Sequence, residues 1–281
     1  MACAIVSDST CDLPAALAQR YRVGIAPTVL QIDGQTYYDN ITLTREAFYA
    51  GLPTFRNFPK TAAASPEVFV ELYRNAGAEE IVSIHLSRKL SAMWTSAQLA
   101  AQDVAPHVRV HVFDSETISM GTGWMVLVAA EMAAQGASAE DILAVLEDMR
   151  PRTRVYALLS TLKYLHKGGR VNRVVAGVGE LLQIKPLLEV YGGEVHLVER
   201  VRLKQRGVAR LLELALRAPR IERLCVLYTG QGMEADIAHL QARAAAHVPI
   251  EQQLVQQVTP GIGAHLGPGG LGFAIVEAQS G

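Results

Sequence analysis

A glycine-rich stretch near the C-terminus, TPGIGAHLGPGG (259–270), carries a single histidine, His265. Glycines let backbone amides approach a ligand closely and form a nest for an anion. A neutral histidine can also donate one ring N–H to an anion. We therefore predict that this stretch is a loop between two strands that contacts a small acidic group. A loop histidine whose ring is satisfied by backbone groups is the alternative at this point.

Two hydroxyl residues, Thr61 and Ser91, have the chemistry to complete such a site. Each is expected in a polar segment shortly before a helix, where its hydroxyl can donate a hydrogen bond to a carboxylate. Hydroxyls in these positions also suit ordinary helix capping. Both interpretations stay open on the residues alone.

The common catalytic signatures are missing from the chain. The segment GIGAHLG (261–267) superficially matches a dinucleotide fingerprint, but Pro268 and a predicted strand follow it where the fingerprint requires a helix. The sequence contains no Walker A lysine motif, no G-x-S-x-G elbow and no H-E-x-x-H. The histidines form no metal pair, and the cysteines have no metal-type spacing. We expect no catalytic residue, no metal and no cofactor.

Length and composition are typical of an ordered globular protein. The 281 residues favour two domains, and half of them are hydrophobic. A net charge of −1 argues against a general nucleic-acid-binding protein. The first residues, MACAIVSDST, lack the basic segment of a signal peptide, and no apolar run reaches about 18 residues. We expect a cytoplasmic protein with no stable membrane insertion.

Positive charge is concentrated in one part of the chain. Between Arg150 and Arg223, 16 Lys and Arg residues accompany 6 Asp and Glu residues. This excess predicts a surface that faces an anionic or acidic partner. Solvated faces of ordinary helices and strands would give the same composition, so that alternative stays open as well.

The N-terminal half shows the alternation of strands and helices that is typical of α/β proteins. Such a pattern predicts a mostly parallel sheet flanked by helices. Asp12 is expected to cap a helix that starts near Pro14. Ligands of parallel sheets bind beyond the carboxyl ends of the strands. We therefore expect four polar segments to share one rim, namely Asp8 to Thr10, Thr61, Ser87 to Ser91, and Asp114 to Ser119.

The pattern of elements changes near Pro151. Two strand-like runs flank Gly192 and Gly193, which predicts a hairpin, and further strands and helices follow. We predict an N-terminal domain with a mostly parallel sheet over residues 1–153 and a C-terminal domain with a mixed α/β sheet over residues 154–281.

Seven segments of the chain, in this order, resemble the DegV family of bacterial fatty-acid-binding proteins. Singly they are weak signals, but together they are specific, and they extend over the whole chain. The segments are IVSDSTCDLP (5–14), PKTAAASP (59–66), IHLSRKLSAMWTSA (84–97), FDSETISMG (113–121), LKYLHKGGR (162–170), LLQIKPLL (181–188) and GIGAHLGPGGLG (261–272).

The resemblance implies a ligand tunnel between two α/β domains. A long-chain fatty acid, palmitate-like or oleate-like, would be the bound ligand, with no other cofactor. Met93 and Ile262 would line the tunnel. The carboxylate would lie at residues that match the head-group positions of the family, which are Thr61, Ser91, Ala92 and His265.

Two segments depart from the family pattern. Where the family commonly has Thr-Ser-Gln-Pro-Ser, this chain has alanine at residues 62–64, which removes a hydroxyl and an amide. Where the family commonly has Ser-Gly-Thr, this chain has Ala92 and Met93 after its serine. An alanine disfavours the backbone conformations that glycine permits.

The resemblance also implies a protein partner. Some members of the family present the fatty acid to a separate ATP-dependent kinase subunit, which converts the carboxylate to an acyl phosphate. The chain would then be a binding subunit rather than an enzyme. Arg170 and Arg202 match family positions linked to kinase docking.

Two other functions stay open at this point. A stand-alone enzyme could act on a small anionic substrate in the same cleft, with His265 as acid or base. A scaffold or regulatory protein could use the basic surface to bind a partner, with the lipid in a structural role.

Overall fold

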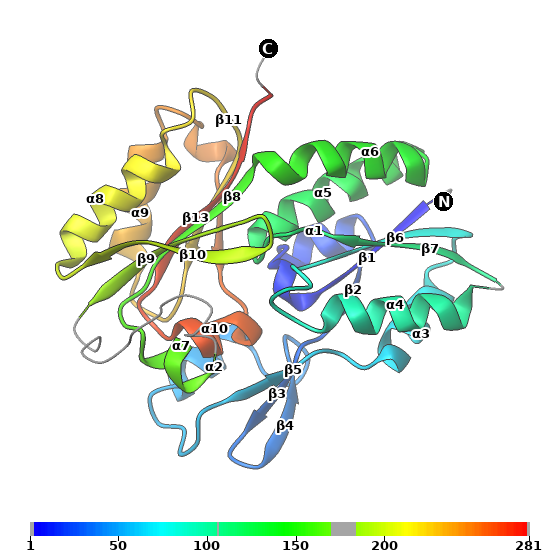
Figure 1. The fold of residues 1–281 in the computed structure, drawn as a ribbon, viewed down its shortest axis with the longest axis horizontal. Helices are drawn as coiled ribbons and strands as arrows, with labels where there is room; N and C mark the ends of the chain where they lie inside the picture. Colours follow the sequence, from blue (N-terminus) through cyan, green and yellow to red (C-terminus); the bar gives the residue numbers. More distant parts are fainter. Residues whose placement is uncertain (1–2, 106, 170–183, 280–281) are drawn as a thin grey trace.

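The computed structural model describes residues 3–105, 107–169 and 184–279. Within them the chain forms a four-stranded sheet, a six-stranded sheet and a small three-stranded sheet. Figure 1 shows the two large sheets side by side, with the three-stranded sheet below the junction between them. The predicted α/β fold with one parallel and one mixed sheet is confirmed.

The N-terminal sheet is parallel throughout. In spatial order its strands are β2 (Gly24–Ala26), β1 (Cys3–Asp8), β6 (Glu80–His85) and β7 (Arg109–Asp114). The central strands β1 and β6 are buried along almost their whole length, as expected for a sheet that is covered on both faces. In Figure 1, α3 (Pro66–Asn75) and α4 (Met93–Val104) lie on one face, and α5 (Met120–Ala134) and α6 (Ala139–Met149) lie on the other.

The second large sheet is mixed. In spatial order its strands are β10 (Glu194–Val201), β9 (Lys185–Tyr191), β8 (Thr153–Leu158), β13 (Leu271–Glu277), β11 (Ile221–Tyr228) and β12 (Leu254–Gln257). β11 and β12 are parallel neighbours, and the other neighbours are antiparallel. The strands β9 and β10 confirm the predicted hairpin. The domain boundary between residues 153 and 154 stays a prediction.

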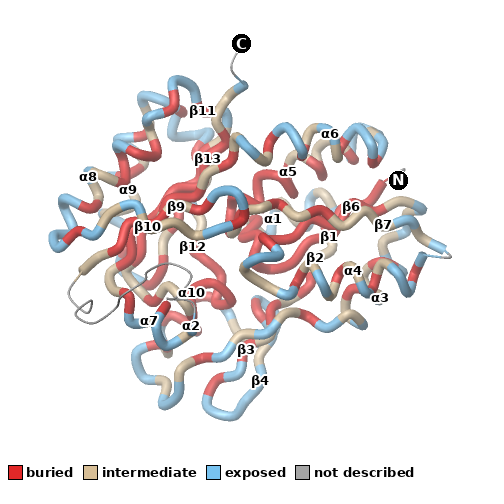
Figure 2. Tube along the Cα trace, in the orientation of Figure 1, coloured by how far each residue is buried: buried red, intermediate tan, exposed pale blue. Residues whose placement is uncertain are grey.

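The outer face of the six-stranded sheet is covered by α8 (Lys204–Ala215) and α9 (Glu234–Ala244), so its other face is turned toward the parallel sheet (Figure 1). The helix α5 packs between the two sheets. Its residues are buried from Met120 to Leu127, and Trp124 Nε1 donates a hydrogen bond to the carbonyl of Ala274 on β13 at 3.1 Å. Figure 2 shows buried residues along the central strands of both sheets and on α5. The two sheets therefore share part of one core.

The three-stranded sheet has the order β4 (Gln35–Tyr38), β3 (Val29–Ile32) and β5 (Lys60–Ala62), and α2 (Arg45–Gly51) packs beside it. Its last strand corrects one prediction, because Thr61 lies within β5 rather than in a loop. The strand pairing explains the difference, since Thr61 is opposite Leu30 of β3. Pairing between segments so far apart in the chain gives no local signal.

The glycine-rich stretch also differs from its prediction as a loop. Residues Pro260–Leu266 form a short helix, α10, with Pro260 in its first turn. Glycine lowers helix propensity, but Gly263 allows a close contact here, because a Cβ at this position would lie 2.2 Å from the hydroxyl oxygen of Tyr49. The helix ends at Gly267, which has a φ of 75°. A second short helix, α7 (Lys163–Lys167), packs against α10.

Candidate ligand-binding cavity

A cavity of about 700 Å³ lies where the three sheets meet. One side is formed by the segments that follow β1, β6 and β7, at the carboxyl ends of the parallel strands. β5 and α10 form a second side, and the inner face of the six-stranded sheet forms a third. The cavity has the size of a small-molecule site. The predicted shared rim is confirmed, since Thr10, Thr61, Ser91 and Ser119 all line this cavity.

Most of the cavity wall is apolar. The inner face of the six-stranded sheet contributes aliphatic side chains from neighbouring strands. Opposite them, Leu86, Leu90 and Ile118 come from the parallel-sheet side. Such a wall favours a ligand with a long apolar body, because burial of apolar surface supplies the binding free energy. The sheet residues are Val155, Ala157, Leu188, Val190, Val195 and Leu227.

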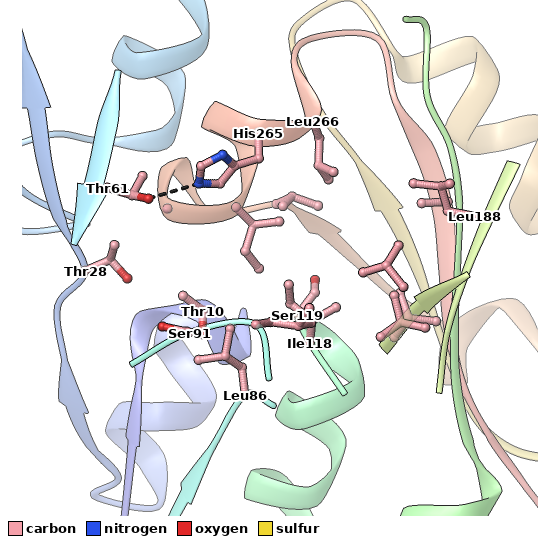
Figure 3. A pocket seen from close by; sticks show the side chains of 18 of the residues that line it. Thr10, Thr28, Thr61, Leu86, Ser91, Ile118, Ser119, Leu188, His265 and Leu266 are labelled. Atoms are coloured by element: carbon pink, nitrogen blue, oxygen red, sulfur yellow. Dashed lines mark hydrogen bonds between the residues drawn. The ribbon is translucent and has the colours of Figure 1, made fainter. Parts of the chain in front are cut away.

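Thr61 and His265 meet at one polar end of the cavity. Thr61 comes from β5 and His265 from the last turn of α10, and both are half-buried. Thr61 Oγ1 and His265 Nε2 lie 2.9 Å apart, and Figure 3 shows the two side chains directed toward each other. Either group can donate this bond, depending on the tautomer of the ring. The pair therefore offers hydrogen-bonding groups to an acidic ligand.

Ser91 lies on the side of the cavity formed by the start of α4. Its Oγ accepts a hydrogen bond from the amide of Met93, the first residue of α4, at 3.2 Å, although the N-cap of this helix is Ala92. A serine hydroxyl has its own hydrogen in addition to the lone pair that accepts this bond. This bond and donation of the serine hydrogen to a ligand are therefore compatible at Ser91.

Ala92 and Met93 fit the cavity without strain. Ala92 has a φ of −81°, an ordinary value that needs no glycine. Met93 is 1% exposed and lines the cavity, and its sulfur accepts a hydrogen bond from the amide of Ala64 at 3.3 Å. The two segments that depart from the family pattern, residues 62–64 and 92–93, are therefore in contact with each other. Ile262 of α10 also lines the cavity.

Another cavity hydroxyl, Thr28, was missed by the sequence reasoning. Its side chain lies near Thr61 in Figure 3, and its Oγ1 accepts a hydrogen bond from Ser9 at 3.0 Å. Thr28 reaches the site because the chain turns into β3, which pairs with β5. No local motif marks it. Thr10 and Ser119 are held from behind by carboxylates, since their hydroxyls donate to Asp8 and Asp12 respectively.

Asp12 belongs to a buried ion pair behind the cavity, which corrects its prediction as a helix cap. Pro14 is the N-cap of α1 (Ala15–Arg20), and Asp12 instead lies 3.1 Å from the guanidinium of Arg45. Asp12 also accepts a hydrogen bond from the amide of Thr259 at 2.8 Å. Burial raises the pKa of Asp12 to about 6, although Arg45 opposes this shift. The pair holds the segment that leads into α10.

A second buried cluster has the order of a catalytic triad. His85 lies 2.7 Å from both Asp8 and Ser83, and the hydroxyl of Tyr73 donates to Ser83 at 2.8 Å. Ser83 and His85 are fully buried and do not line the cavity. Their geometry resembles that of serine hydrolases, but a nucleophile in this place has no access to a substrate. The cluster fastens β1 to β6 and α3.

The residues expected to dock a partner are less well defined. Arg170 lies outside the described residues. Arg202 is exposed in the turn between β10 and α8, and it does not line the cavity. Part of the basic excess is neutralised by ion pairs with Glu189 and Glu199, each of which pairs with two arginines.

Two other kinds of feature, a metal-binding cluster and a membrane-spanning helix, are absent from the described part of the chain. No group of three or more His, Cys, Asp or Glu side chains there is arranged to hold a metal ion. Residues 3–105, 107–169 and 184–279 also contain no helix with the length and hydrophobicity needed to cross a bilayer.

The chain matches one protein-family model over residues 2–278, and that family is described as the uncharacterised DegV family. A DegV domain-containing protein of Caldanaerobacter subterraneus subsp. tengcongensis is 30% identical to this chain over 280 residues, which cover 98% of each protein. A DegV domain-containing protein of Streptomyces coelicolor is 35% identical, and the match covers 97% of each protein.

Solved structures give the same result. A DegV family protein of Thermus thermophilus, described as binding fatty acid, is similar with a TM-score of 0.87 and 34% identity. The match covers 99% of this chain and 100% of that one. DegV of Bacillus subtilis, described as a fatty acid binding protein, has a TM-score of 0.88 and 28% identity over 99% of this chain and 100% of its own.

Proposed function

This chain belongs to the DegV family, and on that premise we propose that it binds one long-chain fatty acid in the cavity between its two large sheets. The fatty acid carboxylate would lie at Thr61, Ser91, Ala92 and His265, and its acyl chain would follow the apolar wall, with Met93 and Ile262 among the lining residues. The division into domains at residues 153 and 154 would place this ligand between the domains.

One observation carries the proposal. The hydrogen-bonded pair of Thr61 and His265 lies at the end of a cavity that is otherwise mostly aliphatic. A ligand with one polar end and a long apolar body matches this distribution. Each methylene removed from water contributes about 0.8 kcal/mol, so the acyl chain supplies most of the affinity. The hydroxyl and imidazole groups then fix the position of the carboxylate.

Mass spectrometry of the freshly purified protein tests this proposal directly. Native spectra give the mass of the intact complex, and solvent extraction identifies the released molecule. We expect one fatty acid per chain, of the palmitate or oleate type. A cavity that is empty and refuses added palmitate and oleate would overturn lipid binding, and would favour an enzyme that acts on a small anionic substrate with His265 as acid or base.

We further propose that the protein presents the bound carboxylate to an ATP-dependent kinase subunit in the cytoplasm and is not itself an enzyme. The ligand end at Thr61 and His265 would then face the partner, with Arg170 and Arg202 in the docking surface. The half-buried state of Thr61 and His265 supports this role, because a reacting carboxylate needs partial access.

A comparison of two arginines tests the docking role. Arg200 and Arg202 are both exposed and lie two positions apart. Arg202→Ala should reduce the rate of acyl-phosphate formation by the kinase while the lipid content stays at one per chain. Arg200→Ala removes the same charge and should leave the rate unchanged. Equal rates for the two variants and the wild type would contradict the docking role of Arg202.

A further inference from the structure

The turn of the β9–β10 hairpin is bonded to the parallel sheet. It consists of Gly192, which is exposed, and Gly193, which is buried. The amide of Gly193 donates a hydrogen bond to the carbonyl of Glu116 at 2.8 Å, and its carbonyl accepts one from Ser87 Oγ at 2.8 Å. Ser87 follows β6 and Glu116 follows β7. A turn of the six-stranded sheet is therefore attached at two points to the loops at the carboxyl ends of the parallel strands.

Ser87 is also the first residue of the turn that carries Ser91. Its carbonyl accepts hydrogen bonds from the amides of Leu90 at 2.9 Å and Ser91 at 3.2 Å. Its Oγ accepts one from the amide of Lys89 at 3.2 Å, in addition to the bond that it donates to Gly193. The side chain of Ser87 therefore stabilises this turn and attaches it to the hairpin.

Lys89 makes a second attachment between the same turn and the hairpin. Its Nζ donates a hydrogen bond to the carbonyl of Gly192 at 3.1 Å and lies 3.1 Å from the carboxylate of Glu194. Lys89 and Glu194 are exposed, and exposed ion pairs contribute little to stability. Ser87 is fully buried, so its bond to the hairpin does not compete with water. The bond of Ser87 is therefore the stronger restraint.

Ser87 and Ser91 differ in their access to a ligand. Ser91 lines the cavity, and its side chain is among those drawn in Figure 3. Ser87 is fully buried and does not line the cavity. A ligand carboxylate can therefore contact Ser91 but cannot reach Ser87. Because a hydrogen bond weakens steeply as it bends, a change in the turn would weaken a bond from Ser91 to the ligand.

We propose that Ser87, bonded to the tip of the β9–β10 hairpin, is a positioning residue that directs the hydroxyl of Ser91 toward the fatty acid carboxylate. The hairpin of one large sheet thereby controls head-group recognition on the side of the other. This inference rests on the proposed function, and it adds a residue that contacts no ligand to those that determine how the carboxylate is bound.

Two ligands of equal length separate recognition of the head group from burial of the acyl chain. Palmitate carries a carboxylate, whereas hexadecan-1-ol carries a neutral hydroxyl on the same number of carbons. Both are titrated into delipidated wild type and Ser87→Ala. The ratio of palmitate to hexadecanol affinity should fall about fivefold in the variant, which corresponds to the roughly 1 kcal/mol by which a hydrogen bond to a charged group exceeds a neutral one. A ratio equal to that of wild type would overturn the proposal.

Ser7→Ala is the matched control for Ser87→Ala. Ser7 is also fully buried, and its Oγ donates a hydrogen bond to a backbone carbonyl, that of Ile84, at 2.6 Å. It lies on β1 and does not line the cavity. Both variants should lower the free energy of unfolding, but Ser7→Ala should leave the affinity ratio at its wild-type value. An equal fall of the ratio in both would indicate general loosening of the fold and would overturn the positioning role.

A double substitution tests whether Ser87 acts through Ser91. Ser91→Ala removes the head-group hydroxyl and should lower the affinity ratio by itself. In that background Ser87→Ala should have no further effect on the ratio, because the group that it positions is gone. If Ser87→Ala lowers the ratio by the same factor with and without Ser91, its effect does not pass through Ser91 and the proposal is wrong.

A pair of turn glycines tests the contact from the side of the hairpin. Gly193 has a φ of 80° and Gly34, in the β3–β4 turn, a φ of 87°, so an alanine costs a similar backbone strain at each. A Cβ on Gly193 would lie 2.9 Å from Ser87 Oγ, whereas a Cβ on Gly34 would meet nothing within 4 Å. Gly193→Ala should lower the affinity ratio and Gly34→Ala should not. A wild-type ratio in Gly193→Ala would contradict the role of the hairpin.

Failure of this inference can be distinguished from failure of the proposed function. A wild-type protein that binds neither palmitate nor hexadecanol would overturn lipid binding, and this inference with it. Normal binding of both ligands by wild type, with the same affinity ratio in Ser87→Ala and Gly193→Ala, would overturn only the positioning role of Ser87.

Discussion

The guanidinium of Arg45 lies 3.1 Å from the carboxylate of Asp12, and both side chains are buried behind the cavity. Arg45 also donates a hydrogen bond to the carbonyl of Gln257, and Asp12 accepts one from the amide of Thr259. These backbone groups directly precede α10, the helix that carries His265. The ion pair therefore fixes the start of that helix to the parallel sheet and to α2.

Removal of Arg45 should destabilise the protein strongly. Arg45→Ala leaves the Asp12 carboxylate buried without its partner, and the loss of one member of a buried pair costs about 3 to 5 kcal/mol. We expect a decrease of this size in the free energy of unfolding, measured by urea denaturation. Arg74→Ala is the control, because the pair of Arg74 with Asp103 is 63% exposed on both sides and exposed pairs contribute little. Equal losses in both variants would contradict the structural role of Arg45.

The buried carboxylate of Asp12 should make the stability of the protein depend on pH. Burial raises the pKa of Asp12 from 3.8 to about 6, so the folded state holds this proton more tightly than the unfolded state. The contribution of Asp12 to the free energy of unfolding is therefore fully present below about pH 4 and is lost as the pH rises through about 6. Burial also raises the pKa of Asp39, which contributes in the same direction.

Asp12→Asn isolates this contribution, because asparagine does not titrate and tolerates the left-handed backbone of this position, where φ is 58°. Urea denaturation at several pH values between about 4 and 7 should show a shallower decline in the variant than in wild type. Parallel curves for the two proteins would show that Asp12 keeps an ordinary pKa.

Thr61 should matter for the ligand more than for the fold. Thr61→Val keeps the shape of the side chain but removes the hydroxyl that contacts His265. A hydrogen bond to a charged group contributes about 1.5 to 3 kcal/mol, so affinity for palmitate should fall roughly ten- to hundredfold. Thr36→Val is a matched control on β4 of the same small sheet, where the threonine is exposed. Calorimetric titration of delipidated protein measures both, and similar affinities would remove Thr61 from the head-group site.

The sequence predicted the rim of the cavity because local patterns determine it. Strands that alternate with helices indicate a parallel sheet, and the residues after such strands gather at one edge. Thr10, Ser91 and Ser119 were placed at this rim by that reasoning, and the structure confirms it. The hairpin at Gly192 and Gly193 was predicted for a similar reason, since two glycines between strand-like runs are a local turn signal.

The sequence did not predict features that arise from contacts between distant segments. Thr28 was not predicted at the cavity, and Thr61 was predicted at its rim but in a loop; both reach it through the pairing of β3 with β5, a strand of only three residues. Asp12 was interpreted as a helix cap because its partner Arg45 lies in a different element. Local patterns describe how a residue relates to its neighbours in the chain, whereas these positions depend on which surfaces pack together.

The helix α10 was not predicted, for the same reason. A substitution in this helix distinguishes tertiary packing from helix propensity, because the two effects change the free energy of unfolding in opposite directions. In an isolated helix, Gly→Ala stabilises by about 1 kcal/mol. At Gly263 a Cβ would lie 2.2 Å from the hydroxyl oxygen of Tyr49. The hydroxyl of Tyr49 donates a hydrogen bond to the carbonyl of Val258 at 2.9 Å. Gly263→Ala must displace either Tyr49 or α10. The free energy of unfolding should therefore decrease, and palmitate affinity should fall with it because His265 moves with the helix. An increase in stability on urea denaturation would mean that α10 does not pack this closely on Tyr49.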